Sequence, residues 1–368
     1  MRCLPITTRI GRCSSARAGE ALVRGRVRDV VLDLAVNSAS ERGLLGIALH
    51  PKFRRTPVTH GLAGSRADDA RVRVSGAKSW GLGEGDEIAP GRSVLRALGG
   101  GSHYEVLLVW DELHYAIMVA KVLRPAVAGD EGALRDLERE AQALRALSHP
   151  VILRGFDAVL DGPHPHLLVE HLEGPTLRRL LKAEPKLPLQ QLIPLGLHVA
   201  AGLAYMESMG WVHLDLKPDN LIMGVPPRII DLSIARTIDR AARTTGFLGT
   251  DPYMAPEQCG APEWQGRLGP AADVFGLAAT LWRAATGAGP FPRGSGARRS
   301  EDPYVRFPQL TAQAPQPPPD MPPALAELLL AGLARDPAER PPAREFAARF
   351  EPLLADLPAR MPRGRGRR

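Results

Sequence analysis

The sequence predicts an α+β protein in which a small sheet-based lobe is followed by a larger helical lobe. Apolar, β-branched runs typical of strands dominate residues 91–172, and apolar residues at helical spacing dominate residues 173–355. Strands that precede helices favour two such segregated lobes. A segment rich in Arg, Gly and Ser precedes them over residues 1–90, where we expect little regular order before about residue 88. A basic tail follows over residues 356–368.

The expected sheet lobe contains three clear patterns. Residues 104–123, "YEVLLVWDELHYAIMVAKVL", predict a hairpin of two apolar strands around the polar turn "DELH". Residues 166–172, "HLLVEHL", predict another strand. Between them lies a helix, marked by apolar residues at spacings of three and four: Leu134, Leu137, Ala141, Leu144 and Leu147.

The expected helical lobe contains three long helical patterns. The first covers residues 189–209 and is followed by Gly210, a residue that often ends helices. The second, "AADVFGLAATLWRAAT", ends at Gly287, and the third covers residues 322–337 with Pro at its start. The Pro-rich residues 308–323 between the last two helices predict an extended loop.

Composition excludes several classes of protein. The net charge is +7, but 41 of the 47 basic residues are Arg, and with so much Ala, Gly and Pro this skew is typical of a G+C-rich genome. We therefore expect no nucleic-acid partner, and we expect solvated charge in the tail, with an anionic partner as the alternative. The 3 cysteines have no disulfide or zinc spacing, which favours a cytoplasmic location. No apolar run is long enough to predict a membrane span.

A glycine-rich stretch, "LGGGSHYEV", precedes the predicted hairpin. Gly99, Gly100 and Gly101 would let backbone N–H groups approach a phosphate without a side chain in the way. Taken alone, such a glycine-rich turn is a plain linker more often than a phosphate site.

A lysine lies within the second strand of the hairpin. Lys121 in "IMVAKVL" needs a counter-ion if the strand is buried. On the following helix, Glu140 lies nearer the apolar stripe than Glu138 does, so Glu140 is the better candidate. A solvated lysine and a surface glutamate remain the alternative.

The octapeptide "HLDLKPDN" is the strongest chemical signal. Asp215 can accept a proton from a hydroxyl, Lys217 can stabilise a transferring phosphate, and the Asn220 oxygen can bind magnesium. Asp231 follows Asp215 by 16 positions in "IIDLS", which leaves room for a hairpin that brings both to one cleft. Phosphoryl transfer needs this combination of groups.

Taken together, residues 91–355 resemble a bacterial protein kinase of the eukaryotic-like (Hanks-type) serine/threonine class. The resemblance implies a bilobal protein-kinase-like fold, with the sheet lobe over about 91–172 and the helical lobe over about 173–355. It rests on these motifs in order: "LGGGSHYEV", "VAKVL", "EREAQALRALSHP", "LLVEHLEGPTL", "HLDLKPDN", "IIDLS", "GTDPYMAPEQ", "ADVFGLAATLW" and "DPAERP".

The resemblance implies a nucleotide site between the lobes. Lys121 would bind the α- and β-phosphates and pair with Glu140, and Val169 would be the gatekeeper. Glu170 and Leu172 would contact adenine through their backbone. Further residues implied to surround the nucleotide are Gly99, Gly100, Gly101 and Val106.

The resemblance also implies the catalytic roles. Asp215 would be the base, Lys217 would contact the γ-phosphate, and Asn220 and Asp231 would hold the metal. Thr250, together with Lys217, favours Ser/Thr over Tyr substrates. Structural roles are implied for an ion pair of Glu257 with Arg340 and for Asp273, which would brace the catalytic loop.

Three departures from the family pattern stand out. Tyr104 replaces the third loop glycine, and Leu232 and Ser233 replace the Phe and Gly that usually follow the metal-binding aspartate. Leu214 replaces an arginine that usually meets a phosphorylated activation loop, which disfavours that kind of activation. Threonines that remain as modification sites in this segment are Thr237, Thr244 and Thr245.

Residues 31–53, "VLDLAVNSASERGLLGIALHPKF", resemble a fragment of the glucose/sorbosone dehydrogenase family, and about 20–55 is the extent of the likeness. A β-propeller needs several blades, so we expect no dehydrogenase activity from this fragment. A coincidental apolar stretch, a fused remnant and a misplaced gene start remain alternatives.

The sequence therefore predicts an enzyme that transfers the γ-phosphate of ATP to Ser/Thr hydroxyls of proteins. Its expected cofactor is Mg²⁺, with Mn²⁺ as a substitute, and its oligomeric state is left open. The alternative, motivated by Tyr104, Leu232 and Ser233, is a pseudokinase that binds nucleotide and acts as an interaction module.

Overall fold

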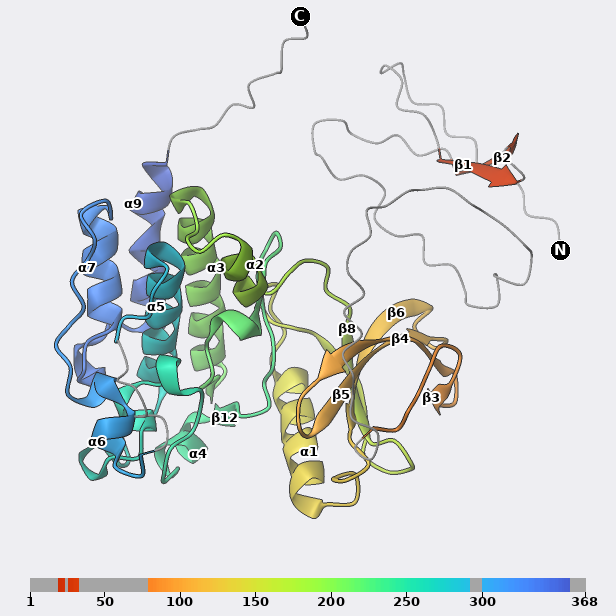
Figure 1. Ribbon diagram of the computed structural model, residues 1–368, viewed down its shortest axis with the longest axis horizontal. Helices are drawn as coiled ribbons and strands as arrows, with labels where there is room; N and C mark the ends of the chain where they lie inside the picture. Colours follow the sequence, from red (N-terminus) through yellow and green to blue (C-terminus); the bar gives the residue numbers. More distant parts are fainter. Residues whose placement is uncertain (1–18, 24–25, 33–78, 292–299, 358–368) are drawn as a thin grey trace, which may run out of the picture.

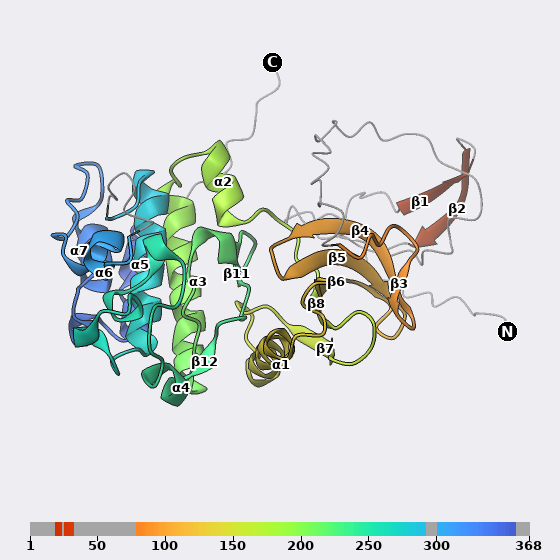
Figure 2. The ribbon, with the colours of Figure 1, turned by 60° about the horizontal axis from the view of Figure 1, so that its bottom comes forward.

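The computed structural model describes residues 19–23, 26–32, 79–291 and 300–357. From residue 79 onward it contains a sheet lobe with one long helix and, beside it, a larger helical lobe (Figures 1 and 2). The α+β class and the order of the two lobes that the sequence predicts are confirmed.

The sheet lobe is built on a six-stranded antiparallel sheet with the strand order β3-β4-β5-β6-β8-β7. The predicted hairpin is confirmed, because β5 and β6 pair from Tyr104↔Leu123 to Asp111↔Ala116. Side chains alternate between the faces of a strand, so Ala120 and Val122 enter one apolar cluster while Lys121 lies on the opposite face. The strands are β3 (Glu87–Ala89), β4 (Arg92–Gly100), β5 (Tyr104–Asp111), β6 (Ala116–Leu123), β7 (Gly155–Val159) and β8 (His166–Glu170).

Helix α1 (Glu131–Ala146) packs against the edge strand β7 and its neighbour β8. It starts at Asp130, whose side chain accepts a hydrogen bond from the backbone N–H of Ala133 at 2.8 Å. Its buried residues include Leu137, Leu144 and one acid, Glu140, whereas Glu138 is exposed. The predicted inward-facing stripe is therefore present, and Glu140 belongs to it.

The helical lobe is centred on α3 and α5, which pack against each other and against the short C-terminal helices (Figure 1). Helix α5 is followed by Gly287 in the left-handed conformation (φ 83°), which confirms the predicted end. The helices are α2 (Leu177–Ala183), α3 (Leu189–Ser208), α4 (Ile238–Ala242), α5 (Pro270–Thr286), α6 (Pro303–Arg306), α7 (Pro323–Gly332), α8 (Ala343–Ala348) and α9 (Phe350–Ala355). The two-residue strands are β9 (Trp211–Val212), β10 (Leu221–Ile222), β11 (Arg228–Ile229) and β12 (Arg236–Thr237).

The predicted ion pair of Glu257 with Arg340 is present in the helical lobe. The guanidinium donates to both carboxylate oxygens, at 2.6 and 2.9 Å, and both side chains are fully buried. Arg340 also donates to the backbone carbonyls of Ala334, Arg335 and Ala271, at 2.7, 3.0 and 3.0 Å. One arginine thus joins segments that are far apart in the sequence.

The sequence patterns did not predict the long strand β4 or the short elements β3, β7, α2, α8 and α9. Helices of two turns or less carry too few apolar repeats to show a period. In β4, Arg92 is buried through ion pairs with Asp111 and Asp157, so a charged residue occupies a core position. Gly99 and Gly100 belong to this strand rather than to a preceding linker.

The chain packs onto the sheet before the boundary expected near residue 91. The Trp80 indole donates to the Leu123 carbonyl at 2.7 Å, and the Trp80 backbone N–H donates to Glu105 at 2.9 Å. Strand β3 also precedes that boundary. The sheet lobe therefore includes residues from at least Ser79, which bonds to Glu105 at 3.1 Å.

Most of the N-terminal segment lies outside the described residues. The described part before residue 79 is an antiparallel pair, β1 (Gly19–Val23) and β2 (Arg26–Leu32). The dehydrogenase-like stretch 31–53 lies outside the described residues except for its first two positions, so that resemblance stays a prediction. Residues 358–368 of the basic tail also lie outside them.

Candidate active site

Lys121 is the residue at which the two lobes meet. Its ammonium lies 2.7 Å from a carboxylate oxygen of Glu140 on α1 and 3.1 Å from Oδ1 of Asp231, which follows β11. Burial would lower the pKa of Lys121, but the two carboxylates outweigh it and raise that pKa, so the ammonium stays charged. The structure thus joins three of the residues predicted from the sequence.

Asp231 occupies a left-handed turn that leaves its carboxylate partly buried beside Lys121. Its backbone is left-handed (φ 64°), while Leu232 is fully buried and anchors the turn. Ser233 is not among the described non-glycine residues with positive φ, so this position needs no glycine, and its hydroxyl bonds to Asp231. The two substitutions in this motif therefore preserve the turn.

The charge of Asp231 is stabilised in the folded protein. Burial alone would raise the pKa of Asp231, but attraction to Lys121 and hydrogen bonds from Ser233 and Lys121 lower it to about 2. The carboxylate is therefore ionised at neutral pH.

This lowered pKa predicts how stability depends on pH. A carboxylate whose pKa is lower in the folded state stabilises the fold above its unfolded pKa of 3.8, and loses that contribution as the pH falls through the folded value of about 2. The difference in unfolding free energy between wild type and Asp231→Asn should therefore be constant from about pH 7 to about pH 5 and smaller at about pH 3. Urea unfolding at these pH values measures it, and a difference that already shrinks between pH 7 and pH 5 would contradict the prediction.

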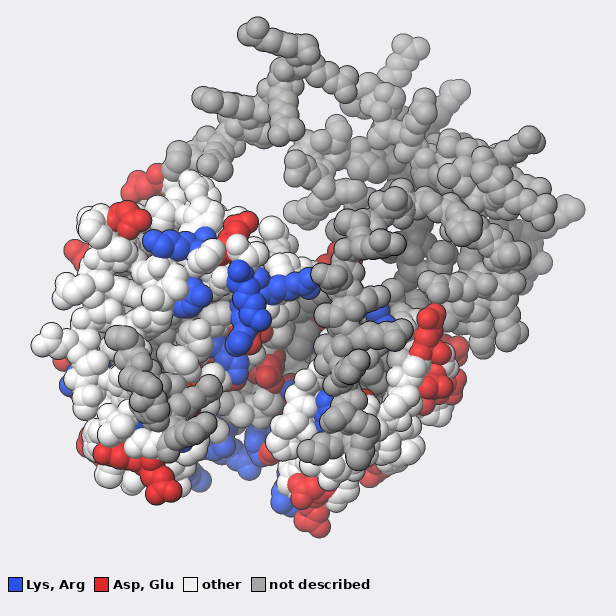
Figure 3. Space-filling view, in the orientation of Figure 1, with Lys and Arg blue, Asp and Glu red and all other residues white. Residues whose placement is uncertain are grey.

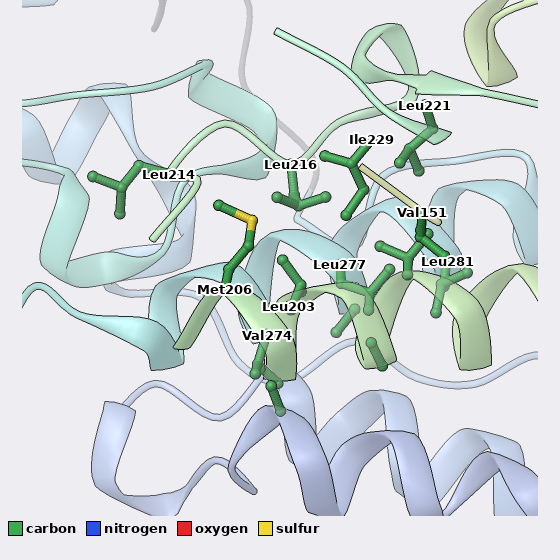
Figure 4. Close-up of a cluster of buried hydrophobic side chains, with 14 of the residues drawn as sticks. Val151, Leu203, Met206, Leu214, Leu216, Leu221, Ile229, Val274, Leu277 and Leu281 are labelled. Atoms are coloured by element: carbon green, nitrogen blue, oxygen red, sulfur yellow. The ribbon is translucent and has the colours of Figure 1, made fainter. Parts of the chain in front are cut away.

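Asp215 lies in the loop after β9, between two leucines that fix its direction. Leu214 and Leu216 are each 2% exposed and belong to the apolar cluster built on α3 and α5 (Figure 4). The Asp273 side chain on α5 accepts the backbone N–H groups of His213 and Leu214, both at 2.7 Å, as expected for a residue that braces the loop. With its neighbours held in the core, the Asp215 carboxylate projects into a polar network.

That network joins Asp215, Lys217 and Thr250 in a closed triangle. Lys217 Nζ lies 2.5 Å from Oδ2 of Asp215, the Thr250 hydroxyl lies 2.7 Å from Oδ1, and the lysine and the hydroxyl are 2.7 Å apart. The Thr250 hydroxyl therefore lies where a substrate hydroxyl would have to lie to give its proton to Asp215.

Asn220 completes the loop and offers one oxygen to a cation. Its amide nitrogen donates to the Asp215 carbonyl at 2.9 Å and to Oδ2 of Asp215 at 3.0 Å. Its backbone carbonyl accepts the N–H of Ile230 at 2.9 Å, which places Asn220 next to the Asp231 turn. An amide oxygen and an ionised carboxylate are hard ligands that suit Mg²⁺, which also keeps several waters. Among the described residues no group of three His, Cys, Asp or Glu side chains forms a metal cluster, so a Mg²⁺ ion would need phosphate oxygens as well.

The glycine-rich turn closes directly onto Tyr104. Gly101 donates its backbone N–H to the Tyr104 carbonyl at 3.0 Å, and Val106 pairs with Lys121 and with Gly99 across the sheet. The glycines, Val106 and Lys121 thus line one end of β4, β5 and β6, as the sequence predicts for a phosphate-binding turn.

The strand that would hold adenine ends at Glu170. Its backbone N–H donates to the Arg154 carbonyl at 3.0 Å, and its carboxylate receives Arg228 at 3.0 and 3.2 Å. The Glu170 side chain therefore forms part of the contact between the lobes. The preceding residue, Val169, is buried. Leu172, two residues later, is partly buried against the main core.

Helix α2 flanks the catalytic loop with positive charge. Figure 3 shows Lys and Arg side chains gathered over α2, whose sequence carries Arg178, Arg179 and Lys182 and no acid. Arg178 forms an exposed ion pair with Asp219 at 3.1 Å. The loop that holds Asp215 is thus next to a basic helix.

Sequence reasoning missed five contacts at this site. Gln258 donates to the carbonyls of Leu214 and Leu248, both at 2.7 Å, and ties the loop to the following segment. Arg236 donates to Thr244 at 2.6 Å. The others are Ser233 with Asp231 and the Tyr104 ring with Lys121. None has a signal in the linear sequence, because each depends on side-chain directions set by tertiary packing.

Comparison with known proteins defines the class. The protein kinase domain matches residues 92–349, well over half of the chain, and the chain belongs to the protein kinase family. Members of this family generally use ATP and Mg²⁺. In the part of the chain that is described, no helix is long and apolar enough to cross a membrane.

Individual relatives are bacterial. The chain is 31% identical to "Probable serine/threonine-protein kinase PkwA" of Thermomonospora curvata over 73% of this chain and 35% of that protein. It is 31% identical to "Serine/threonine-protein kinase PkaB" of Streptomyces coelicolor, over 66% of this chain and 58% of that protein. It is also 31% identical to "Serine/threonine-protein kinase PknL" of Mycobacterium tuberculosis, over 60% of this chain and 54% of that protein. The chain thus spans between about a third and three fifths of these relatives' length.

Proposed function

We propose that this chain is a serine/threonine protein kinase that transfers the γ-phosphate of ATP to protein hydroxyls. The observation that carries the proposal is the contact of Lys121 with Glu140 and Asp231, at 2.7 and 3.1 Å. This contact brings Lys121, which would bind phosphate, next to Asp231, which would bind the metal. The relatives of this chain are named as serine/threonine kinases.

The proposed reaction assigns one task to each group of the catalytic loop. The substrate hydroxyl attacks the γ-phosphorus, its proton passes to the Asp215 carboxylate, and the bond to the β-phosphate oxygen breaks to release ADP. Lys217, 2.5 Å from Asp215, neutralises charge on the transferring group. Lys121 orients the remaining phosphates.

Asn220 and Asp231 would hold Mg²⁺, with Mn²⁺ as a substitute, because both offer oxygen donors near Asp215. The ion, when bound, supplies charge neutralisation for the phosphates. The low pKa of Asp231, about 2, keeps that ligand ionised throughout.

The alternative is a pseudokinase that binds nucleotide without turnover and serves as an interaction module. The favouring observation is that Tyr104 covers Lys121, with the ammonium 4.4 Å from the ring centroid. Lys217 and Thr250 also occupy both oxygens of Asp215.

A transfer assay separates the two functions. The full chain is incubated with labelled ATP and Mg²⁺ or Mn²⁺, with and without a generic basic protein substrate. We expect label on Ser or Thr, and none with Lys121→Met. Thermal stabilisation by ATP without any transfer would instead favour the pseudokinase.

We further propose that the catalytic unit comprises about residues 79–357, since Ser79 and Trp80 bond to the sheet. We assign no dehydrogenase activity to the segment before it. Removing residues 1–78 should leave transfer within about twofold of the full chain, and a larger loss would show that the segment contributes.

A further inference from the structure

Tyr104 lies over the lysine that the proposed function assigns to the phosphates. The Lys121 ammonium is 4.4 Å from the centroid of the Tyr104 ring, within the range of a cation–π contact. Tyr104 lies on the same strand and the same face of β5 as Val106, and Val106 pairs with Lys121. The ring therefore belongs to the nucleotide side of the sheet.

The ammonium of Lys121 already has three neighbours in this arrangement. A lysine ammonium has three N–H donors. Glu140 and Asp231 receive hydrogen bonds at 2.7 and 3.1 Å, and the ring covers a further side of the group. A phosphate oxygen that approaches the ammonium therefore competes with Asp231 or with the ring.

The Asp231 contact is the harder one to displace. Its carboxylate is a full charge, further fixed by the Ser233 hydroxyl. The ring offers a weaker attraction, from its quadrupole alone. Displacement of the ring is therefore the lower-energy route by which a phosphate gains access to Lys121.

The backbone holds the ring in place. Gly101 donates to the Tyr104 carbonyl at 3.0 Å, and Tyr104 pairs with Leu123 at the end of β6. Gly100 has φ 149°, and a Cβ there would lie 2.2 Å from the Tyr104 carbonyl oxygen. The turn is thus folded tightly around the backbone of Tyr104, and its partly buried ring packs against the main apolar core.

The phenol is neutral in this position. Burial is the main cause that raises the pKa of Tyr104 to about 12, and the Lys121 ammonium opposes the increase. The tyrosine thus presents a ring and a neutral hydroxyl to the site rather than a phenolate that could pair with the lysine.

We propose that Tyr104 is a gate on the phosphate subsite: its ring covers Lys121 in the nucleotide-free protein and must swing aside before a di- or triphosphate binds. Tyr104 then sets the affinity for the phosphate chain but not for the adenosine part of the nucleotide. This inference rests on the proposed function, because it uses Lys121 as the phosphate-binding cation.

Calorimetric titration of the full chain with Mg-ADP and with adenosine tests the gate without requiring turnover. Tyr104→Ala should bind Mg-ADP between about 2-fold and about 30-fold more tightly than wild type, which is the strength of a cation–π contact expressed as a ratio of affinities. Adenosine should bind both proteins equally. Tyr104→Phe, which keeps the ring, should bind Mg-ADP within about twofold of wild type. Tyr115→Ala is the matched control, since Tyr115 is 74% exposed in the turn between β5 and β6.

A second measurement avoids any loss of folding in the alanine variant. The protein is labelled with ¹³C-tyrosine, and the NMR signal of the Tyr104 ring is the one that disappears in Tyr104→Phe. In wild-type protein this signal should shift when Mg-ADP is added and should not shift when adenosine is added. An unshifted signal in the presence of bound Mg-ADP would overturn the gate. The gate would also be overturned if Tyr104→Ala bound Mg-ADP no more tightly than wild type does. It would be overturned as well if the variant's affinity for adenosine increased as much as its affinity for Mg-ADP. Failure of every protein, wild type included, to bind Mg-ADP or adenosine would instead overturn the proposed function itself.

Discussion

Replacing Asp215 with alanine is expected to lower the rate of phosphate transfer by about 10²- to 10⁴-fold, the usual contribution of a general base. Asp215 receives Lys217 at 2.5 Å and Thr250 at 2.7 Å, so its loss removes both the proton acceptor and the group that positions Lys217. Affinity for ATP should change little, because Lys121, the cation assigned to the α- and β-phosphates, is paired with Glu140 and Asp231 rather than with Asp215. Initial rates at saturating ATP, together with KM for ATP, measure the two effects separately.

Asp219→Asn is the matched control for this prediction. Asp219 lies in the same loop but forms an exposed ion pair with Arg178, which contributes little to stability. The rate of phosphate transfer by Asp219→Asn should stay within about twofold of the wild-type rate. A rate for Asp215→Ala within tenfold of wild type, or an equal loss in both variants, would remove Asp215 from the role of base.

Replacing Arg340 with alanine is expected to destabilise the fold by about 3–5 kcal/mol, the usual cost of leaving one partner of a buried ion pair alone. Both Arg340 and Glu257 are fully buried, and the arginine also satisfies three backbone carbonyls. Urea unfolding of wild type and variant measures the loss. The hydrogen bonds of Arg340 go to Glu257 and to the carbonyls of Ala271, Ala334 and Arg335 rather than to Asp215, so activity should be retained at temperatures where the variant remains folded.

An exposed ion pair in the same lobe provides the comparison. Arg349 and Glu345 form an ion pair on α8 in which both side chains are about half exposed. Arg349→Ala should cost no more than about 0.5 kcal/mol. If the two arginine variants lose similar stability, burial is not the reason for the strength of the Glu257–Arg340 pair.

The catalytic residues could be predicted because their sequence signals are local. "HLDLKPDN" places Asp215, Lys217 and Asn220 within one turn, and the structure shows that the side chains of Lys217 and Asn220 both bond to the Asp215 carboxylate. Helical spacing alone preferred Glu140 to Glu138, since a stripe of apolar residues defines which side of a helix faces inward. Because these features depend on a few residues that are close in the sequence, they can be recognised without knowledge of the fold.

The expectations drawn from the departures were less complete. Leu232 and Ser233 motivate the pseudokinase alternative, yet Leu232 fills a fully buried position and Ser233 bonds to Asp231. Tyr104 motivates the same alternative as the replacement of a loop glycine, and the structure adds that its ring covers Lys121. The sequence shows which family residue is missing at a position. It does not show which contacts the new side chain makes, because these depend on where that side chain points in the fold.

By itself, the sequence determined the class of fold, the order of the lobes and the set of polar groups for phosphoryl transfer. Periodicity and short motifs carry that information, because each reflects a repeat or turn of a few residues. The tertiary structure alone decided that Lys121 meets Asp231 across 110 positions of sequence, that the sheet lobe begins at least as early as Ser79, and that Tyr104 covers the lysine. Such contacts follow from how the sheet and helices pack, since side chains remote in sequence become neighbours only when both lobes are formed.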